Sequence, residues 1–333
     1  MKFVSFLNKS GEERVGLSIN NKTIDISNAA KKLSLDVPSK IVLILENASS
    51  LFPKIKKIQD AYLEGKLNVF EDDKLIKKLA PIPKPTSCRD GYAFRQHVEA
   101  ARRNRGAPMI PEFDEFPVFY FTNHNAIVGE GSVVVEQDHL DQLDFELEWA
   151  CVIGKRGKNI SVQDADSYII GFTIMNDFSA RKLQMQEMKL SLGPAKGKDF
   201  ATALGPWLVT VDELKSHEIK TPQGSQYNLE MKAYHNGKCV SEGNAKTMSW
   251  TFAQIIERAS YGVELLPGDV IGSGTVGTGC YLELNGTWAG LAKERGEGFT
   301  PVWLKEGDTI ELEIEGLGRL QNQIKKNHEK HSG

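Results

Sequence analysis

The chain has 333 residues, a length that fits one large and one small domain at roughly 100–200 residues each. Hydrophobic residues make up 40% and charged residues 26%, which is ordinary for a globular protein and excludes long disorder or a fibrous repeat. Because 41 Lys and Arg stand against 44 Asp and Glu, the net charge is -3. This balance excludes the basic field that binds nucleic acid or an anionic membrane, so we expect neither partner.

The cysteines are far apart in the sequence, with no CxxC pair and no zinc-ligand spacing. We expect reduced, mostly structural thiols at Cys88, Cys151, Cys239 and Cys280. No segment offers about 18 uncharged apolar residues, the length needed to cross a bilayer. These features predict a soluble, cytoplasmic protein.

The first 80 residues predict a small α+β domain. Short alternating runs separated by turn residues predict strands over Lys2–Leu7, Val15–Ile19 and Thr23–Ile26. From Lys40 to Lys66 apolar residues recur at helical intervals, and Pro53 predicts a break into two helices. Three prolines follow within residues 80–87, so we expect the domain boundary there, with domains at 1–80 and 81–333.

The second domain is predicted to be mainly β, which makes the whole chain α+β. Short β-rich runs predict its strands, over Ser132–Glu136, Phe145–Ile153, Tyr168–Ile174, Trp207–Thr210, Met231–Tyr234, Val270–Ser273, Cys280–Leu284 and Thr309–Ile314. The polar, lysine-rich residues 321–333 predict a frayed end.

Acidic residues alternate with apolar ones in LDQLDFELEWACVIG, which places Asp144, Glu146 and Glu148 on one face of a predicted strand. Taken alone, this pattern is more often a solvated strand face. The following WACVIG predicts burial, and buried clustered carboxylates repel one another unless a cation neutralises them. With Asp90 and Asp177 nearby in unusual contexts, such hard oxygen ligands favour Mg²⁺, Mn²⁺ or Ca²⁺.

A turn at Asp90–Gly91 leads into a predicted helix that carries His97 on its apolar face. A lone histidine on such a face is usually a core residue, but its place near the Asp90 turn favours a catalytic role. The arginines that follow are either a solvated basic face or contacts for an anionic substrate: Arg102, Arg103 and Arg105.

Further candidates lie in two glycine-rich segments. Arg181 and Gln184 are one helical turn apart, and Lys198 stands between Gly197 and Asp199, where a functional and a solvated role are equally favoured. A glycine-rich loop around Thr275 permits close approach of backbone to a small ligand. Glu283 follows in a predicted apolar strand, a position that is more often outward-facing than buried.

These motifs, in this order, resemble the fumarylacetoacetate hydrolase family over about residues 85–315. The resemblance implies metal ligation by carboxylates and a nearby second ion, at Asp90, Glu146, Glu148, Asp177, Lys198 and Thr202. It implies a histidine base, a glutamate that orients it and oxyanion donors, at His97, Glu283, Arg181, Gln184 and Lys198. It also implies substrate contacts at Tyr92, Arg105, Gln184 and Thr275. Two positions depart from the family pattern: its substrate tyrosine aligns with Met188, and its lid arginine has only Arg103 or Arg105 as a counterpart.

The resemblance further implies a mixed β-roll catalytic domain, a homodimer, and a bound Mg²⁺ or Ca²⁺, with Mn²⁺ possible. The activity implied first is hydrolysis of a carbon–carbon bond in a 1,3-diketo acid such as fumarylacetoacetate, a step of tyrosine degradation. Alternatives within the family are an acylpyruvate hydrolase, an oxaloacetate decarboxylase or a tautomerase. An alternative outside enzymology is a metal-stabilised binding module without catalysis.

Overall fold

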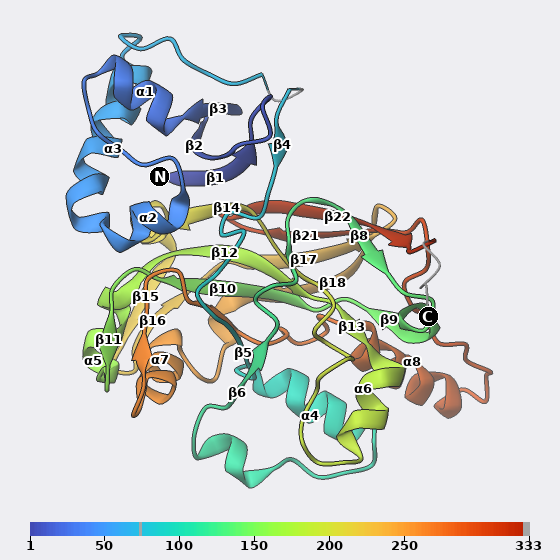
Figure 1. Ribbon diagram of the computed structural model, residues 1–333. Coiled ribbons are helices and arrows are strands. Elements are labelled where there is room, and N and C mark those ends of the chain that lie inside the picture. The colour runs from blue at the N-terminus through green and yellow to red at the C-terminus, as the bar shows by residue number, and fades with distance from the viewer. Residues whose placement is uncertain (73–74, 329–333) are drawn as a thin grey trace.

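The computed structural model describes residues 1–72 and 75–328. In these residues the largest sheet has 11 strands, of which nine run in the order β3-β2-β1-β14-β12-β10-β20-β5-β6, while β4 pairs with β1 and β7 with β14 (Figure 1). The strands are β1 Lys2–Leu7, β2 Glu13–Ile19, β3 Lys22–Asp25, β4 Lys77–Lys78, β5 Cys88–Gly91, β6 Phe119–Thr122, β7 Ile127–Val128, β10 Leu147–Ile153, β12 Ile169–Asp177, β14 Thr202–Thr210 and β20 Val270–Gly272.

A second sheet packs on the first. It has the order β18-β17-β21-β22-β8 in the described residues, and both sheets contribute side chains to one large hydrophobic core. Its strands are β8 Gly131–Val135, β17 Glu230–His235, β18 Lys238–Asn244, β21 Thr309–Ile314 and β22 Gly318–Lys326. Short pairs complete the β structure: β9 Leu143–Asp144 with β13 Ser179–Ala180, β11 Gly157–Lys158 with β19 Glu264–Leu265, and β15 Glu218–Thr221 with β16 Gly224–Tyr227. The predicted α+β, mainly β class is confirmed.

Three of the described α-helices lie in the N-terminal unit, and the others lie around the larger body (Figure 1). The N-terminal group is α1 Ile26–Lys32, α2 Ile41–Glu46 and α3 Ala48–Leu63. The others are α4 Arg95–Arg103, α5 Val162–Ala165, α6 Arg181–Met188, α7 Phe252–Ser260 and α8 Tyr281–Glu294. Among the described helices none is long and apolar enough to cross a membrane.

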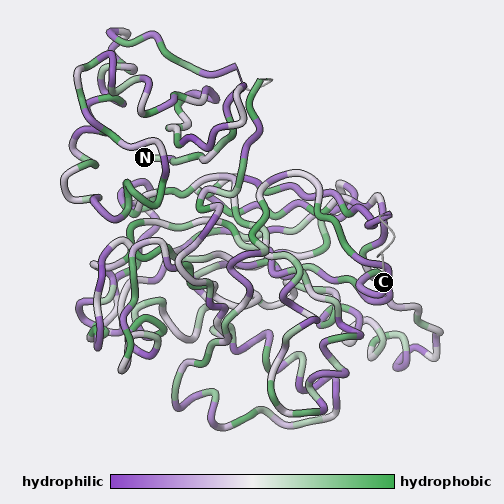
Figure 2. The backbone as a smooth tube through the Cα atoms, in the orientation of Figure 1, coloured by the Kyte–Doolittle hydropathy of each residue, from purple (hydrophilic) through white to green (hydrophobic). Residues whose placement is uncertain are grey.

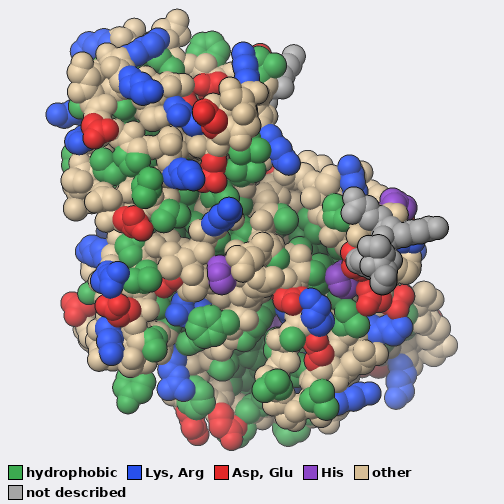
Figure 3. Space-filling model, viewed as in Figure 1, with side chains coloured by type: hydrophobic (Ala, Val, Ile, Leu, Met, Phe, Trp, Pro, Cys, Tyr) green, Lys and Arg blue, Asp and Glu red, His purple; other side chains and the backbone are tan. Residues whose placement is uncertain are grey.

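The N-terminal unit is joined to the larger body by strand pairing. β1 is antiparallel to β14, with Phe3 opposite Leu208, so the N-terminal strands extend the same sheet. Figure 3 shows this unit as a lobe above the larger body. The division into domains at residues 80 and 81 stays a prediction.

Two predictions about the N-terminal elements are wrong in detail. Pro53 lies inside α3, and the break falls at Asn47, whose φ of -121° and ψ of 28° end the helical geometry. The N–H that proline lacks would have bonded the carbonyl of Ser49, an exposed residue whose carbonyl water can reach. Ile26 begins α1 and does not end β3, because the Asp25 side chain caps the helix by accepting the Asn28 N–H.

The strands of the larger body follow the predicted runs, except at residues 280–284. The segment Cys280–Leu284 was predicted as a strand, but Tyr281 begins helix α8. The physical reason is an acceptor far away in sequence: the Asp144 carboxylate accepts the backbone N–H groups of Tyr281 and Leu282. The predicted frayed end is wrong up to Lys326, which closes β22, and residues 329–333 lie outside the described residues.

An aromatic cluster packs α7 against the first sheet. The ring of Trp149 on β10 stacks on that of Phe172 on β12 at 4.8 Å between centroids, and Phe252 of α7 lies edge-on to Trp149 at the same distance. Figure 2, which colours the backbone by hydropathy, shows hydrophobic stretches in the body of the molecule that contains these strands. Aromatic burial of this kind is a main source of core stability.

We predict that Phe172→Ala lowers the free energy of unfolding by about 3–5 kcal/mol, because it opens a cavity in this cluster. The control is Phe121→Ala, since Phe121 is 64% exposed, and it should cost about 1 kcal/mol or less. Urea unfolding followed by tryptophan fluorescence measures both. Equal losses in the two variants would contradict the assignment of the core.

Candidate active site

Carboxylates from three strands of the large sheet meet in the interior of the larger body. Asp90 lies on β5, Glu148 on β10 and Asp177 at the end of β12, while Glu146 immediately precedes β10. Pairing brings them together, because Asp90 is opposite Gly272 on β20 and Glu148 is opposite Met175 on β12. All four side chains are buried. Ligand oxygens of Asp90, Glu146 and Glu148 lie within 4.8 Å of one another, a spacing that suits one metal ion.

Lys198 and Arg181 neutralise part of this charge. The Lys198 ammonium donates to Glu146 Oε2 and Asp177 Oδ2, at 2.7 Å each. Arg181 donates to Glu146 Oε1 and to Asp144 Oδ2 at 2.8 Å, and to Gln184 Oε1 at 3.0 Å. Lys198 and Arg181 are themselves buried, so the predicted solvated role for Lys198 is excluded by its geometry.

The pKa values of the carboxyl groups show how much of their negative charge Lys198 and Arg181 leave without a neutralising partner. Burial and the charge of Asp177 raise the pKa of Asp90 from 3.8 to about 7. Burial and Asp90 raise the pKa of Glu148 well above its usual range. The pKa of Asp177 is also raised, mainly by burial. Burial acts in the same direction on Glu146, but Lys198 and Arg181 outweigh it and lower the pKa of that carboxyl.

The donor set therefore fits a divalent cation. Asp90 and Glu148 face each other without a basic side chain between them, and the Gly274 N–H contacts both at 3.2 Å. The Thr275 hydroxyl donates to Glu148 at 3.4 Å. Oxygen ligands without thiolate or imidazole favour Mg²⁺, Ca²⁺ or Mn²⁺ over zinc.

A histidine and a glutamate from two helices form a buried pair beside the acids. His97 Nδ1 on α4 lies 2.7 Å from Glu283 Oε2 on α8, and both side chains are buried. An ionised carboxylate can only accept, so Nδ1 carries the hydrogen and Nε2 is left as the acceptor. The Thr278 N–H holds the other oxygen of Glu283 at 3.0 Å. The local pattern around Glu283 favoured an outward position and the family resemblance a place beside His97; in the structure helix α8 turns it inward to His97.

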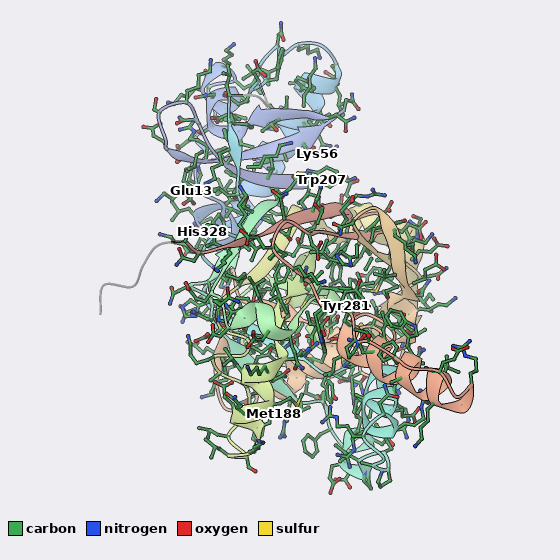
Figure 4. The ribbon with its side chains drawn as sticks, turned by 90° about the vertical axis from the view of Figure 1, so that its right-hand side faces the viewer. Glu13, Lys56, Met188, Trp207, Tyr281 and His328 are labelled. Carbon is green, nitrogen blue, oxygen red and sulfur yellow. The ribbon has the colours of Figure 1, made fainter. Side chains whose placement is uncertain are left out.

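A cavity of about 440 Å³ opens onto this chemistry. Its lining includes nine predicted residues: Asp90, Tyr92, His97, Arg105, Glu146, Arg181, Gln184, Lys198 and Thr275. Arg102 and Met188 line it as well, whereas Arg103 is not among the described lining residues. Figure 4 labels Met188 at the end of α6 and Tyr281 at the start of α8, both on the half of the molecule away from the N-terminal unit.

The remaining predicted site residues are not among the described lining residues of this cavity. Glu148, Asp177 and Glu283 support the lining residues, and the Thr202 hydroxyl is 3.5 Å from Asp177 Oδ1. A larger hollow of about 810 Å³ lies between α3 and residues 154–156 and 167–170, and it contains none of the predicted site residues. We therefore place the chemistry in the smaller cavity.

Sequence reasoning missed two residues of the site. The Tyr120 hydroxyl donates to Asp177 Oδ2 from the edge strand β6. Its neighbours in VFYFT are apolar or aromatic, so no local signal marks it. Asp144 stood in the acidic alternation but was given no role, and the structure pairs it with Arg181. The alternation itself was the signal for Asp144.

The fold and the site define an α+β protein with a buried, oxygen-rich cation site and a histidine–glutamate pair on one cavity. Residues 86–325 match the family described as fumarylacetoacetate (FAA) hydrolase C-terminal, so the chain belongs to that family. The resemblance found in the sequence motifs is thereby confirmed.

Relatives in this family bear different activity names. The chain is 30% identical over 325 residues to the oxaloacetate tautomerase YisK of Bacillus subtilis, covering 93% of this chain and 95% of the relative. It is 29% identical over 300 residues to the fumarylacetoacetase of Oryza sativa subsp. japonica, covering 73% and 69%. Its fold is similar to maleylpyruvate hydrolase from Sphingobium sp. SYK-6 in complex with manganese(II) and pyruvate, with a TM-score of 0.67, 19% identity and coverage of 98% and 100%.

We predict that the cation-free protein loses stability as the pH rises from 3.8 toward about 7. The folded pKa of Asp90 is raised, so its contribution is fully present below the unfolded pKa and is lost as the pH rises through the folded pKa. Melting temperatures in a chelator measure this, and Asp90→Asn should flatten the slope. Adding Mg²⁺ or Mn²⁺ near pH 8 should restore stability, because the cation needs the ionised carboxylates. An unchanged slope in Asp90→Asn would contradict the prediction.

Proposed function

We propose that this protein is a divalent-cation-dependent enzyme that interconverts the enol and keto forms of an oxaloacetate-like 2-oxo acid. The observation that carries the proposal is the contact of His97 Nδ1 with Glu283 Oε2 at 2.7 Å, which leaves the other ring nitrogen free as an acceptor at a cavity shared with the acidic cluster. The similarity to an oxaloacetate tautomerase over nearly the whole chain favours this reaction over hydrolysis.

Asp90, Glu146 and Glu148, with Asp177 close by, would hold the cation. When bound there, it supplies positive charge that stabilises the enolate oxygens and orients the substrate. Arg181 and Lys198 lie at the same cavity and attract the anionic substrate. A well-placed donor to a developing oxyanion contributes about 3–4 kcal/mol.

His97 moves the proton at carbon in this scheme. In the enol-to-keto direction, the enol hydroxyl proton leaves to solvent and the carbon between the two carbonyl groups takes a proton from the His97 imidazolium. His97 then regains a proton from solvent. Glu283 stabilises the charged imidazolium and keeps the ring in one tautomer. In the reverse direction, neutral His97 removes the proton from carbon.

Other predicted residues have supporting roles in the proposal. Tyr92, Gln184 and Thr275 contact the substrate, and Arg105 binds a distal carboxylate from the cavity wall. Thr202 and Lys198 adjoin Asp177, where a second ion is proposed. On the family resemblance we also propose that the protein is cytoplasmic and that it forms a homodimer. Light scattering on the purified protein tests the homodimer.

Hydrolysis of a carbon–carbon bond in a 1,3-diketo acid is the second candidate. The same histidine–glutamate pair favours it, because His97 could take a proton from water. The water oxygen would bond to the carbonyl carbon, the adjacent carbon–carbon bond would break, and the leaving carbanion would be protonated. Fumarylacetoacetate would then give fumarate and acetoacetate.

Assays of the purified protein with several candidate substrates distinguish these activities. We expect purified protein with Mg²⁺ or Mn²⁺ to accelerate loss of the enol absorbance of oxaloacetate, without forming pyruvate. Pyruvate from oxaloacetate would show decarboxylation, and fumarate or a free acyl acid from a diketo acid would show hydrolysis. No turnover of oxaloacetate, acylpyruvate or fumarylacetoacetate would favour a non-catalytic metal-binding module.

We predict that His97→Gln lowers kcat by about 10²–10⁴-fold, because the general base is lost. Cation binding should persist, since His97 is outside the carboxylate cluster. The matched control is His139→Gln: His139 is also buried, but it stacks on Phe200 at 4.2 Å, away from the cavity. Steady-state kinetics and calorimetric cation titration measure both effects. Full activity in His97→Gln would show that another group moves the proton.

A further inference from the structure

The buried carboxylate of Asp144 contacts both Arg181 and the start of α8, the helix that carries Glu283. Asp144 Oδ2 accepts from Arg181 Nε at 2.8 Å and from the backbone N–H of Leu282 at 2.9 Å. Its other oxygen accepts the backbone N–H of Tyr281 at 2.7 Å. Asp144 is 0% exposed, so these bonds replace its contact with water.

The bonds to Tyr281 and Leu282 fix the start of α8. The first N–H groups of a helix have no partner inside the helix, and that end carries partial positive charge. Among the described contacts, the Cys280 side chain at the N-cap makes no capping bond. The Asp144 carboxylate takes that role from β9, where it also suits the helix dipole.

Glu283 follows directly on the capped residues. Its backbone position in the first turn of α8 directs its carboxylate to His97 Nδ1 at 2.7 Å. A change in the position of this turn would move the oxygen that holds the base. On the other side, loss of Asp144 would leave Arg181 with Glu146 as its remaining carboxylate partner.

We propose that Asp144 is a positioning residue that sets the place of both Arg181 and Glu283, and so aligns the oxyanion-binding cation with the base. The inference rests on the proposed role of His97. Partners that orient a functional side chain commonly contribute roughly 10–100-fold to activity. Asp144 touches neither substrate nor cation in this scheme.

The chain contains a matched control. Asp25 is also buried, pairs with Arg14 Nε at 2.8 Å and caps α1 through the Asn28 N–H at 2.9 Å. It lies in the N-terminal unit, away from the cavity. Asp25→Asn and Asp144→Asn therefore remove the same kinds of contact, and only the second does so at the site.

The test is a double-mutant cycle with Glu283→Gln, measured as kcat and KM per folded molecule. We expect Asp144→Asn to lower kcat roughly 10–100-fold in the wild-type background. In the Glu283→Gln background the same change should lower kcat clearly less, because only the part that acts through Arg181 remains. Asp25→Asn should lower the melting temperature and leave kcat unchanged.

Asp144→Glu keeps the charge but moves it by one methylene, and it takes the place of Asp144→Asn in the cycle if the latter does not fold. Equal losses of kcat in both backgrounds would overturn the positioning role. Retained activity in Glu283→Gln and His97→Gln would instead overturn the proposed function, so the two failures are distinguishable.

Discussion

The constraint on which the site depends is an excess of buried negative charge. Among the described residues the clustered buried acids are Asp90, Asp144, Glu146, Glu148 and Asp177, besides Glu283 at His97, and the buried bases that pair with the cluster are Lys198 and Arg181. Carboxylates in such surroundings repel one another and favour protonation, as the raised pKa of Asp90 shows. A divalent cation relieves this repulsion. The same charge holds Lys198 and Arg181 in fixed positions and would hold a cation.

The sheet supplies the rigidity that this charge requires. Asp90, Glu148 and Asp177 come from β5, β10 and β12 of one sheet, whose strands also supply side chains to the hydrophobic cores, so the carboxylates cannot move apart without disrupting the pairing. β10 lies between β12 and β20 near the middle of the sheet. The helices that carry the base and its orienting partner then close one end of this arrangement. The contacts of Asp144 and Arg181 connect strand, loop and helix.

One proton-transfer geometry serves more than one reaction in this arrangement. A base held at one nitrogen can take a proton from carbon or from water, and the enolate formed next to a cation is common to both outcomes. This explains how members of one family bear the names of tautomerases and hydrolases. Met188 and Arg105 lie on the wall of the same cavity. The histidine–glutamate pair itself does not distinguish the two.

The sequence by itself determined which acids share one strand face and which segment carries His97. The period of two in a strand is local backbone geometry, so the face shared by Glu146 and Glu148 follows from their spacing. The short step from Asp90 to His97 joins strand β5 to helix α4; the helix was predicted, but the predicted turn at Asp90–Gly91 is a strand. Only the tertiary structure decided that Glu283 stands in a helix, that Arg105 and not Arg103 lines the cavity, and that Tyr120 reaches Asp177. Helix α8 begins where it does because its first N–H groups meet Asp144, 137 residues away in the chain. The sequence around Tyr281 cannot indicate an acceptor that lies so far away in the chain.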